Sequence, residues 1–238
     1  MKYKMIIFDI GKTLLDKNVS ANISPQVLSD IKALRNKGIK VGVCTMRTQR
    51  HCLEIIPVEL DFYICLNGSH ITCDGELIFD SPLEYCNTSS DYLSYGAESV
   101  FYSNEKAKQK ALKNGFLIDK CGYIEPVYNF VLFDVTKEQA ADYASYNIEY
   151  WENTQTLSLQ NADSSKCLGI QRVLEYYKFE EPILYFGDGP NDLAIFKQYR
   201  DCVCMGDCYP KLCEFALFQT SSCKDDGVSQ ALRRLKIL

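Results

Sequence analysis

The chain has 238 residues, of which 47% are hydrophobic, so it can bury a substantial core in one large domain or two smaller ones. Its net charge of −5 and the lack of a dense lysine or arginine tract disfavour nucleic acid and anionic membranes as partners. Its apolar runs are far shorter than the ~20 residues that cross a bilayer. We therefore expect a cytoplasmic protein with no membrane partner, and the sequence carries no signal for an oligomeric state.

The predicted elements begin with a buried strand over residues 5–8, which ends at Asp9. A helix follows, with Ser24 as its cap, Pro25 in its first turn and Gly38 at its end. Short apolar strands are predicted next, within residues 39–45, 61–69, 182–189, 202–207 and 215–220. Buried apolar strands that alternate with helices are typical of an α/β fold with a doubly wound parallel sheet.

The middle of the chain has a different character, because its polar content rises and tyrosines accumulate. Strands are predicted there at residues 99–103, 130–135, 148–152 and 156–160, and helices at 104–115 and 136–147. We expect a smaller α+β domain over residues 82–163, inserted into a core formed by residues 1–81 and 164–238.

Three polar side chains follow predicted strands directly: Asp9, Thr45 and Asp188. The carboxyl ends of strands in a doubly wound sheet form its ligand-binding edge. Lys166 lies in the first turn of a predicted helix, where its charge adds to an anion site. Asp192 adds a carboxylate four residues after Asp188, and such oxygen ligands suit Mg²⁺. Each residue alone is common in turns or on helices, but together they indicate phosphoryl transfer.

The chain contains 12 cysteines, many of them within apolar segments, where they are expected to act as small core residues. Five of them fall close together near the C-terminus: Cys202, Cys204, Cys208, Cys213 and Cys223. They lack the paired C-x2-C spacing of zinc sites, and the first two alternate within a strand-like run. We therefore expect them to pack in the core rather than to bind zinc.

These motifs closely resemble those of the haloacid dehalogenase superfamily, and its type IIB, Cof-like branch of sugar-phosphate phosphatases fits best. The family patterns D-x-D-G-T, T-G-R and G-D-G-x-N-D correspond here to DIGKT, TMR and GDGPND, and Lys166 stands at the remaining motif. The inserted segment lies between the second and third motifs, as the cap domain of that branch does.

The resemblance implies a phosphoric monoester hydrolase that acts on a small phosphorylated metabolite with Mg²⁺ as cofactor. Asp9 would form an aspartyl-phosphate, while Thr45 and Lys166 would hold the phosphoryl group. Arg47 and Asn191 would lie near the phosphate or the rest of the substrate. The implied metal ligands are Asp9, the backbone carbonyl of Gly11, Asp188 and Asp192.

The first motif departs from the family at two positions, since Gly11 replaces its second aspartate and Lys12 replaces its glycine. In family phosphatases that aspartate protonates the leaving group and then activates water. General acid–base catalysis is worth ~10²–10⁴ in rate, so we expect a slow enzyme.

Two alternatives stay open for this motif. One is a non-catalytic sensor of a phosphorylated ligand. The other is a phosphonate-cleaving relative that uses an amine such as Lys106, Lys108 or Lys110. The two histidines, His51 and His70, are expected to be structural.

Overall fold

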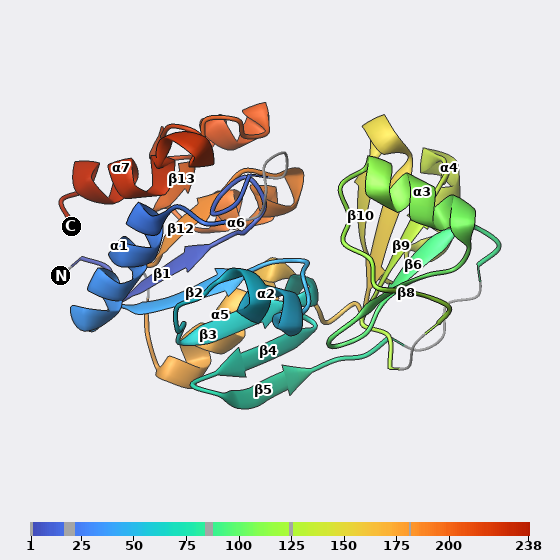
Figure 1. Ribbon diagram of the computed structural model, residues 1–238, viewed down its shortest axis with the longest axis horizontal. Helices are drawn as coiled ribbons and strands as arrows, with labels where there is room; N and C mark the ends of the chain where they lie inside the picture. The colour runs from blue at the N-terminus through green and yellow to red at the C-terminus, as the bar shows by residue number, and fades with distance from the viewer. Residues whose placement is uncertain (1, 17–21, 84–87, 124–125, 181) are drawn as a thin grey trace.

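The protein forms two lobes, each built on its own β-sheet (Figure 1). The computed structural model describes residues 2–16, 22–83, 88–123, 126–180 and 182–238. An eight-stranded sheet, which we call the core sheet, has the strand order β14-β13-β12-β1-β2-β3-β4-β5. A six-stranded sheet, which we call the cap sheet, has the order β10-β11-β9-β6-β7-β8.

The core sheet is parallel from β14 to β3. Its strands are β1 (Met5–Phe8), β2 (Lys40–Cys44), β3 (Phe62–Cys65), β4 (His70–Cys73), β5 (Glu76–Asp80), β12 (Leu184–Gly187), β13 (Cys202–Cys204) and β14 (Phe218–Gln219). The helices of this lobe are α1 (Pro25–Asn36), α2 (Gln49–Ile55), α5 (Lys166–Tyr177), α6 (Leu193–Gln198) and α7 (Gly227–Arg234). This arrangement confirms the predicted α/β class.

Both faces of the core sheet are covered, which explains why its strands are apolar throughout. Alternate residues of a strand point to opposite faces. Ile6 and Phe8 of β1 therefore belong to one hydrophobic cluster, with Ile31 of α1. Met5 and Ile7 belong to the other, which contains side chains of α5 and α6.

The antiparallel edge formed by β4 and β5 is a feature that the sequence analysis did not predict. The signal was present, because Asp74 and Gly75 join these strands and Asp-Gly is a strong hairpin turn sequence. Both residues have positive φ angles, of 48° and 85°, as this type of turn requires.

The cap sheet uses segments from the middle of the chain only. Its strands are β6 (Tyr92–Tyr95), β7 (Val100–Tyr102), β8 (Lys120–Cys121), β9 (Asn129–Phe133), β10 (Asn147–Trp151) and β11 (Thr156–Gln160), with helices α3 (Glu105–Lys113) and α4 (Lys137–Ala140). The helix predicted over residues 136–147 is shorter, because α4 continues only as a 3₁₀ turn, Ala141–Tyr143, before β10 begins.

One face of the cap sheet carries a buried polar network that connects to the core lobe. Asn129 Nδ2 donates to Ser158 Oγ at 2.9 Å and to Gln160 Oε1 at 3.1 Å. Gln160 Oε1 also accepts a hydrogen bond from Asn67 of the core lobe, at 3.2 Å. Buried polar groups of this kind require such partners, so the network fixes where the cap sheet sits on the core. In the described part of the chain, no helix has the length and apolar character needed to span a membrane.

Candidate active site

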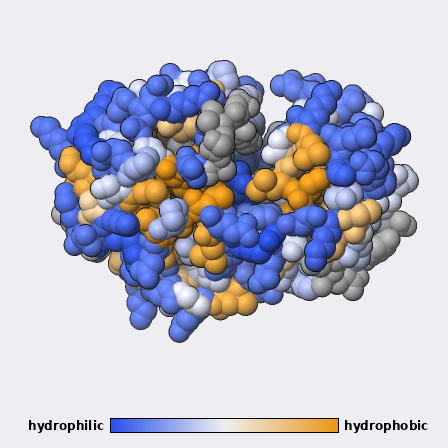
Figure 2. Space-filling view, in the orientation of Figure 1, coloured by the Kyte–Doolittle hydropathy of each residue, from blue (hydrophilic) through white to orange (hydrophobic). Residues whose placement is uncertain are grey.

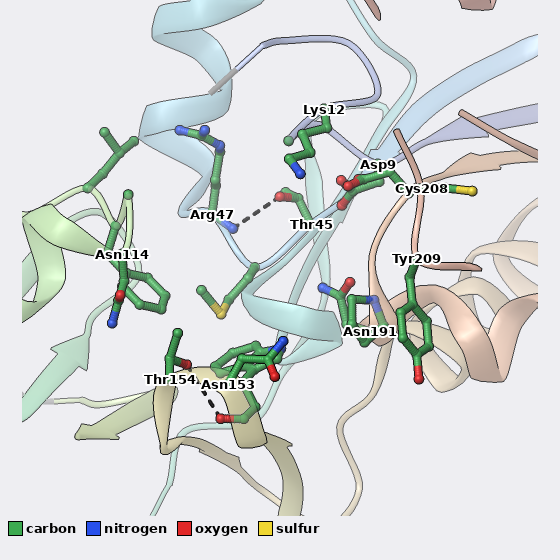
Figure 3. A pocket seen from close by; sticks show the side chains of 18 of the residues that line it. Asp9, Lys12, Thr45, Arg47, Asn114, Asn153, Thr154, Asn191, Cys208 and Tyr209 are labelled. Carbon is green, nitrogen blue, oxygen red and sulfur yellow. Dashed lines mark hydrogen bonds between the residues drawn. The ribbon is translucent and has the colours of Figure 1, made fainter. Parts of the chain in front are cut away.

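The residues predicted to share one edge of the core sheet do so. Asp9 follows β1, Thr45 follows β2 and Asp188 follows β12, and all three line one cavity. Figure 3 shows Asp9 and Thr45 close together on the core side of that cavity. The backbone holds them there, since the Asp9 amide donates to Phe186 O at 2.9 Å and the Thr45 amide to Ile64 O at 2.8 Å.

Lys166 joins two of the predicted carboxylates. Its Nζ donates to Asp9 Oδ1 at 2.8 Å and to Asp192 Oδ1 at 2.7 Å, and the residue is only 4% exposed. Burial alone would lower the pKa of this ammonium group, but the charges of Asp192 and Asp9 more than offset it and hold the pKa well above its usual value. Lys166 is therefore a fixed positive charge beside Asp9 at neutral pH.

Asp192 organises the loop that carries Asp188. Its Oδ2 accepts hydrogen bonds from the backbone amides of Asp188 and Gly189, both at 3.0 Å. Its Oδ1 accepts from Tyr185 Oη at 2.7 Å in addition to Lys166. Gly187 is needed here, because a Cβ at that position would lie 2.5 Å from Asp192 Oδ2. Asp192 thus holds both the Asp188 loop and the lysine.

The three aspartates form a suitable set of donors for a hard cation. Oxygen atoms of Asp9, Asp188 and Asp192 all lie within 4.8 Å of one another. Mg²⁺ prefers carboxylate oxygens together with water and phosphate oxygens. The site therefore fits the predicted Mg²⁺, with Asp192 committed to several protein hydrogen bonds as well.

Two glycines allow the helix that carries Lys166 to approach the sheet. Gly68 follows β3 with a φ of 94°, and a Cβ there would lie 2.2 Å from the carbonyl oxygen of Ser165, the N-cap of α5. Within α5, a Cβ on Gly169 would lie 2.5 Å from Ile64 Cγ2. This close approach places the first residue of α5, Lys166, next to Asp9.

Gly11 and Lys12 both line the cavity, directly after Asp9. Lys12 has a φ of 56°, a left-handed conformation that costs a residue with a Cβ about 1–2 kcal/mol. Gly11 is not among the residues with positive φ. The backbone at position 11 is therefore compatible with a side chain, whereas position 12 is the one that favours glycine.

The cavity lies between the lobes and has a volume of about 750 Å³. Arg47 and Asn191, both predicted near the substrate, line it from the core side. The cap contributes Tyr95 and residues 114–117 and 150–154. Figure 2 shows apolar surface on the cap side of the hollow between the lobes.

His51 is expected from the sequence to be structural, but it also lines the same cavity. It lies in the first turns of α2, with its Nε2 3.6 Å from Asp119 Oδ2 of the cap. Burial lowers its pKa from the usual value. Its neighbour Arg50 also pairs with Asp119, which links α2 to the cap. His70 instead pairs with Asp80 at 2.9 Å, within the β4–β5 hairpin.

Glu149 is a second residue that the sequence analysis missed. It lies on β10 opposite Ser158, two residues before Trp151, which lines the cavity. Its Oε1 is buried and has no hydrogen-bond partner among the described residues. Burial raises its pKa to about 7, and the charges of Lys166 and Asp192 also act on it. The cap therefore brings a carboxyl group into the electric field of the catalytic edge.

A model of the haloacid dehalogenase-like hydrolases matches residues 6–232. The chain belongs to this family. The predicted membership of the haloacid dehalogenase superfamily, and with it the assignment as a hydrolase, is thereby confirmed.

Named relatives agree with this assignment. The chain is 29% identical to the "Putative bifunctional phosphatase/peptidyl-prolyl cis-trans isomerase" of Streptococcus pyogenes over its whole length, but it spans only 55% of that protein. It is 25% identical to the "Putative phosphatase YkrA" of Bacillus subtilis, and each chain is covered fully. Its fold matches that of the subclass IIB sugar phosphatase BT4131 with a TM-score of 0.81 and 20% identity, covering 99% of this chain and 100% of the other.

The buried carboxyl group of Glu149 predicts a particular pH dependence of stability in metal-free protein. Because its pKa rises on folding, from 4.5 to about 7, the native state binds more protons between these values, and stability falls as pH rises through that window. Glu149→Gln should therefore be more stable than wild type at pH 8, by about 3 kcal/mol at most, and equal to it near pH 4. Thermal melts in chelator at both pH values measure this.

The same change at the exposed Glu152, which follows β10, serves as the control and should shift neither melt. Equal stability of Glu149→Gln and wild type at pH 8 would show that Glu149 is not buried beside the site in solution.

Proposed function

We propose that this protein is a Mg²⁺-dependent phosphatase that hydrolyses a small phosphorylated metabolite through an aspartyl-phosphate on Asp9. The observation that carries the proposal is the position of Lys166, whose buried ammonium group bridges Asp9 and Asp192 at the edge of the cavity. A fixed cation beside a carboxylate nucleophile is what the transfer of an anionic phosphoryl group needs.

The residues around Asp9 have distinct tasks in this proposal. An oxygen of Asp9 attacks phosphorus, and the bond from phosphorus to the leaving oxygen breaks. Lys166 holds Asp9 Oδ1 and offers positive charge to the phosphoryl oxygens. Thr45 supplies a hydroxyl, and its Oγ1 is already oriented by the amide of Arg47, at 3.2 Å.

The Mg²⁺ site would be formed by Asp9, the carbonyl of Gly11 and Asp188, with Asp192 close by. A bound Mg²⁺ would offset the negative charge that Asp9 and the phosphate bring together. Asp192 contributes chiefly by holding the Asp188 loop and Lys166 in place.

The cap would cover the substrate, so its residues would select the part beyond the phosphate. Asn114, Asn153 and Thr154 come from the cap side of the cavity in Figure 3 and offer polar groups to a hydroxylated substrate. The sugar-phosphate class predicted from the sequence fits this lining, while the aromatic rings of Phe116 and Trp151 add apolar wall.

The phosphonate-cleaving alternative has little support from the cavity. The three lysines considered for it, Lys106, Lys108 and Lys110, belong to α3 and are not among the residues that line the cavity. Lys110 is also paired with Asp91 and Asp134. The sensor alternative differs from a phosphatase in turnover alone, so a kinetic experiment separates the two.

Phosphate release from a panel of phosphorylated metabolites tests the proposed function. We expect release by wild type with Mg²⁺, loss of release with chelator, and loss in Asp9→Asn, because the amide keeps the shape of the nucleophile without its charge. Asp74→Asn makes the same change in an exposed hairpin turn and should leave activity unchanged. Binding of these ligands without any release would favour the sensor, and full activity in Asp9→Asn would exclude the proposed nucleophile.

Restoration of the family motif is a separate prediction. In Gly11→Asp combined with Lys12→Gly, a carboxyl group returns beside Asp9 and the left-handed position regains glycine. We expect turnover to rise, by at most the ~10²–10⁴ that general acid–base catalysis contributes. Steady-state rates on the best substrate of the panel measure it, with Lys12→Gly alone as the control. A folded double variant with unchanged turnover would show that the enzyme does not lack this group.

A further inference from the structure

Three of the five cysteines near the C-terminus come together in space, although their spacing did not indicate a zinc site. Cys204 ends β13, Cys208 lies in the loop that follows, and Cys213 lies in the 3₁₀ helix Pro210–Glu214. We call these three residues the thiol cluster. The 3₁₀ helix turns the chain back, so that Cys213 Sγ lies 3.6 Å from Cys204 Sγ and 3.7 Å from Cys208 Sγ.

These separations match the geometry of metal thiolates. A Zn–S bond of ~2.3 Å in a tetrahedral site puts neighbouring sulfurs about 3.8 Å apart. Both Sγ–Sγ distances from Cys213 are within a few tenths of an ångström of that value, and all three sulfurs lie within 4.8 Å of one another. The sulfurs are much too far apart for a disulfide, whose S–S bond is ~2.05 Å long.

The surroundings of the thiol cluster also suit a bound cation. Gln219 Nε2 lies 3.7 Å from Cys208 Sγ and is held by the carbonyl of Gly206 at 3.0 Å, so it directs an N–H group at the sulfur. Such hydrogen bonds from outside the ligand set orient metal ligands. Cys204 is buried whereas Cys213 is exposed, so the cluster is anchored on one side and open to solvent on the other.

The thiol cluster borders the cavity, which Cys208 lines, but its sulfurs form a group of their own, distinct from the group of aspartate oxygens. The side chain of Cys208 points its sulfur away from Asp9 in Figure 3. The two sites are joined through the backbone, because the amide of Tyr209 donates to Asp188 O at 2.7 Å. Thiolates prefer softer cations than the oxygen ligands of the aspartate site do, so the two sites would select different metals.

We propose that Cys204, Cys208 and Cys213 form a second metal site, which takes a thiophilic divalent cation such as Zn²⁺ and leaves its fourth position to water. Because a thiol binds such a cation as the thiolate, binding would release protons. The bound cation would fix the loop between β13 and the 3₁₀ helix, next to Asp188.

Competition for Zn²⁺ against a chromophoric chelator tests the site in reduced, metal-free, full-length protein. We expect wild type to retain one Zn²⁺ per chain, and we expect Cys208→Ser and Cys213→Ser each to weaken binding at least tenfold. Cys121→Ser, at an exposed cysteine of β8 in the cap, is the matched control and should bind as wild type does. Zn²⁺ should also raise the melting temperature of wild type and of this control, but not of the two cluster variants.

A second measurement excludes binding at the aspartates. Cd²⁺ bound by thiolates gives an ultraviolet charge-transfer band, and we expect the full band in Asp188→Asn and a weaker band in Cys213→Ser. The proposal is wrong if wild type retains no Zn²⁺, if the serine variants bind as tightly as wild type, or if Asp188→Asn abolishes the band.

Discussion

A buried lysine between two carboxylates is the interaction on which the site depends. An ammonium group that is removed from water needs compensating charge, and Lys166 receives it from Asp9 and Asp192. The carboxylates depend equally on the lysine, because Asp192 is fully buried. Each supporting feature serves this contact: the glycines that admit α5, the backbone amides that bind Asp192, and the strand ends that present Asp9.

The change at Gly11 affects a different part of the chemistry. In the proposed mechanism, the groups that would attract and orient a phosphoryl group remain, whereas position 11 lacks the carboxyl group that would move protons at the leaving oxygen and at the attacking water. Loss of that group would slow breakdown of a covalent intermediate as well as its formation. Glu149 brings another carboxyl group, with a pKa of about 7, toward the same edge from the cap, but the first motif itself contains no substitute of the same kind.

Much of the site could be predicted from the sequence, because strand ends and a helix start are local features. Asp9, Thr45 and Asp188 follow short apolar runs, and Lys166 follows a capping serine, so their positions did not require knowledge of distant contacts. The fold class followed from the same apolar runs. The Asp-Gly turn of the β4–β5 hairpin is also a local signal.

The remaining features depend on contacts between distant segments, which periodicity does not reveal. Glu149 is half-buried with its Oε1 enclosed, and it feels the charges of the core lobe because the cap packs against that lobe. His51 lines the cavity because α2 faces the cap. The thiol cluster forms because a 3₁₀ helix reverses the chain, so its three cysteines meet without the paired C-x2-C spacing of zinc sites. The short α4 is a case in which a local pattern was too long: of the helix predicted over residues 136–147, α4 and its 3₁₀ turn end at Tyr143, and Asn147 pairs with Gln160 in the sheet.

The central claim is that Asp9 is phosphorylated during turnover. Its most direct test is a rapid acid quench of wild type with Mg²⁺ and its best substrate, followed by peptide mapping by mass spectrometry. We expect a phosphorylated peptide that contains Asp9 in wild type during turnover, and none in Asp9→Asn, which lacks the nucleophile. Steady release of phosphate with no phosphorylated Asp9 peptide at any quench time would contradict the account.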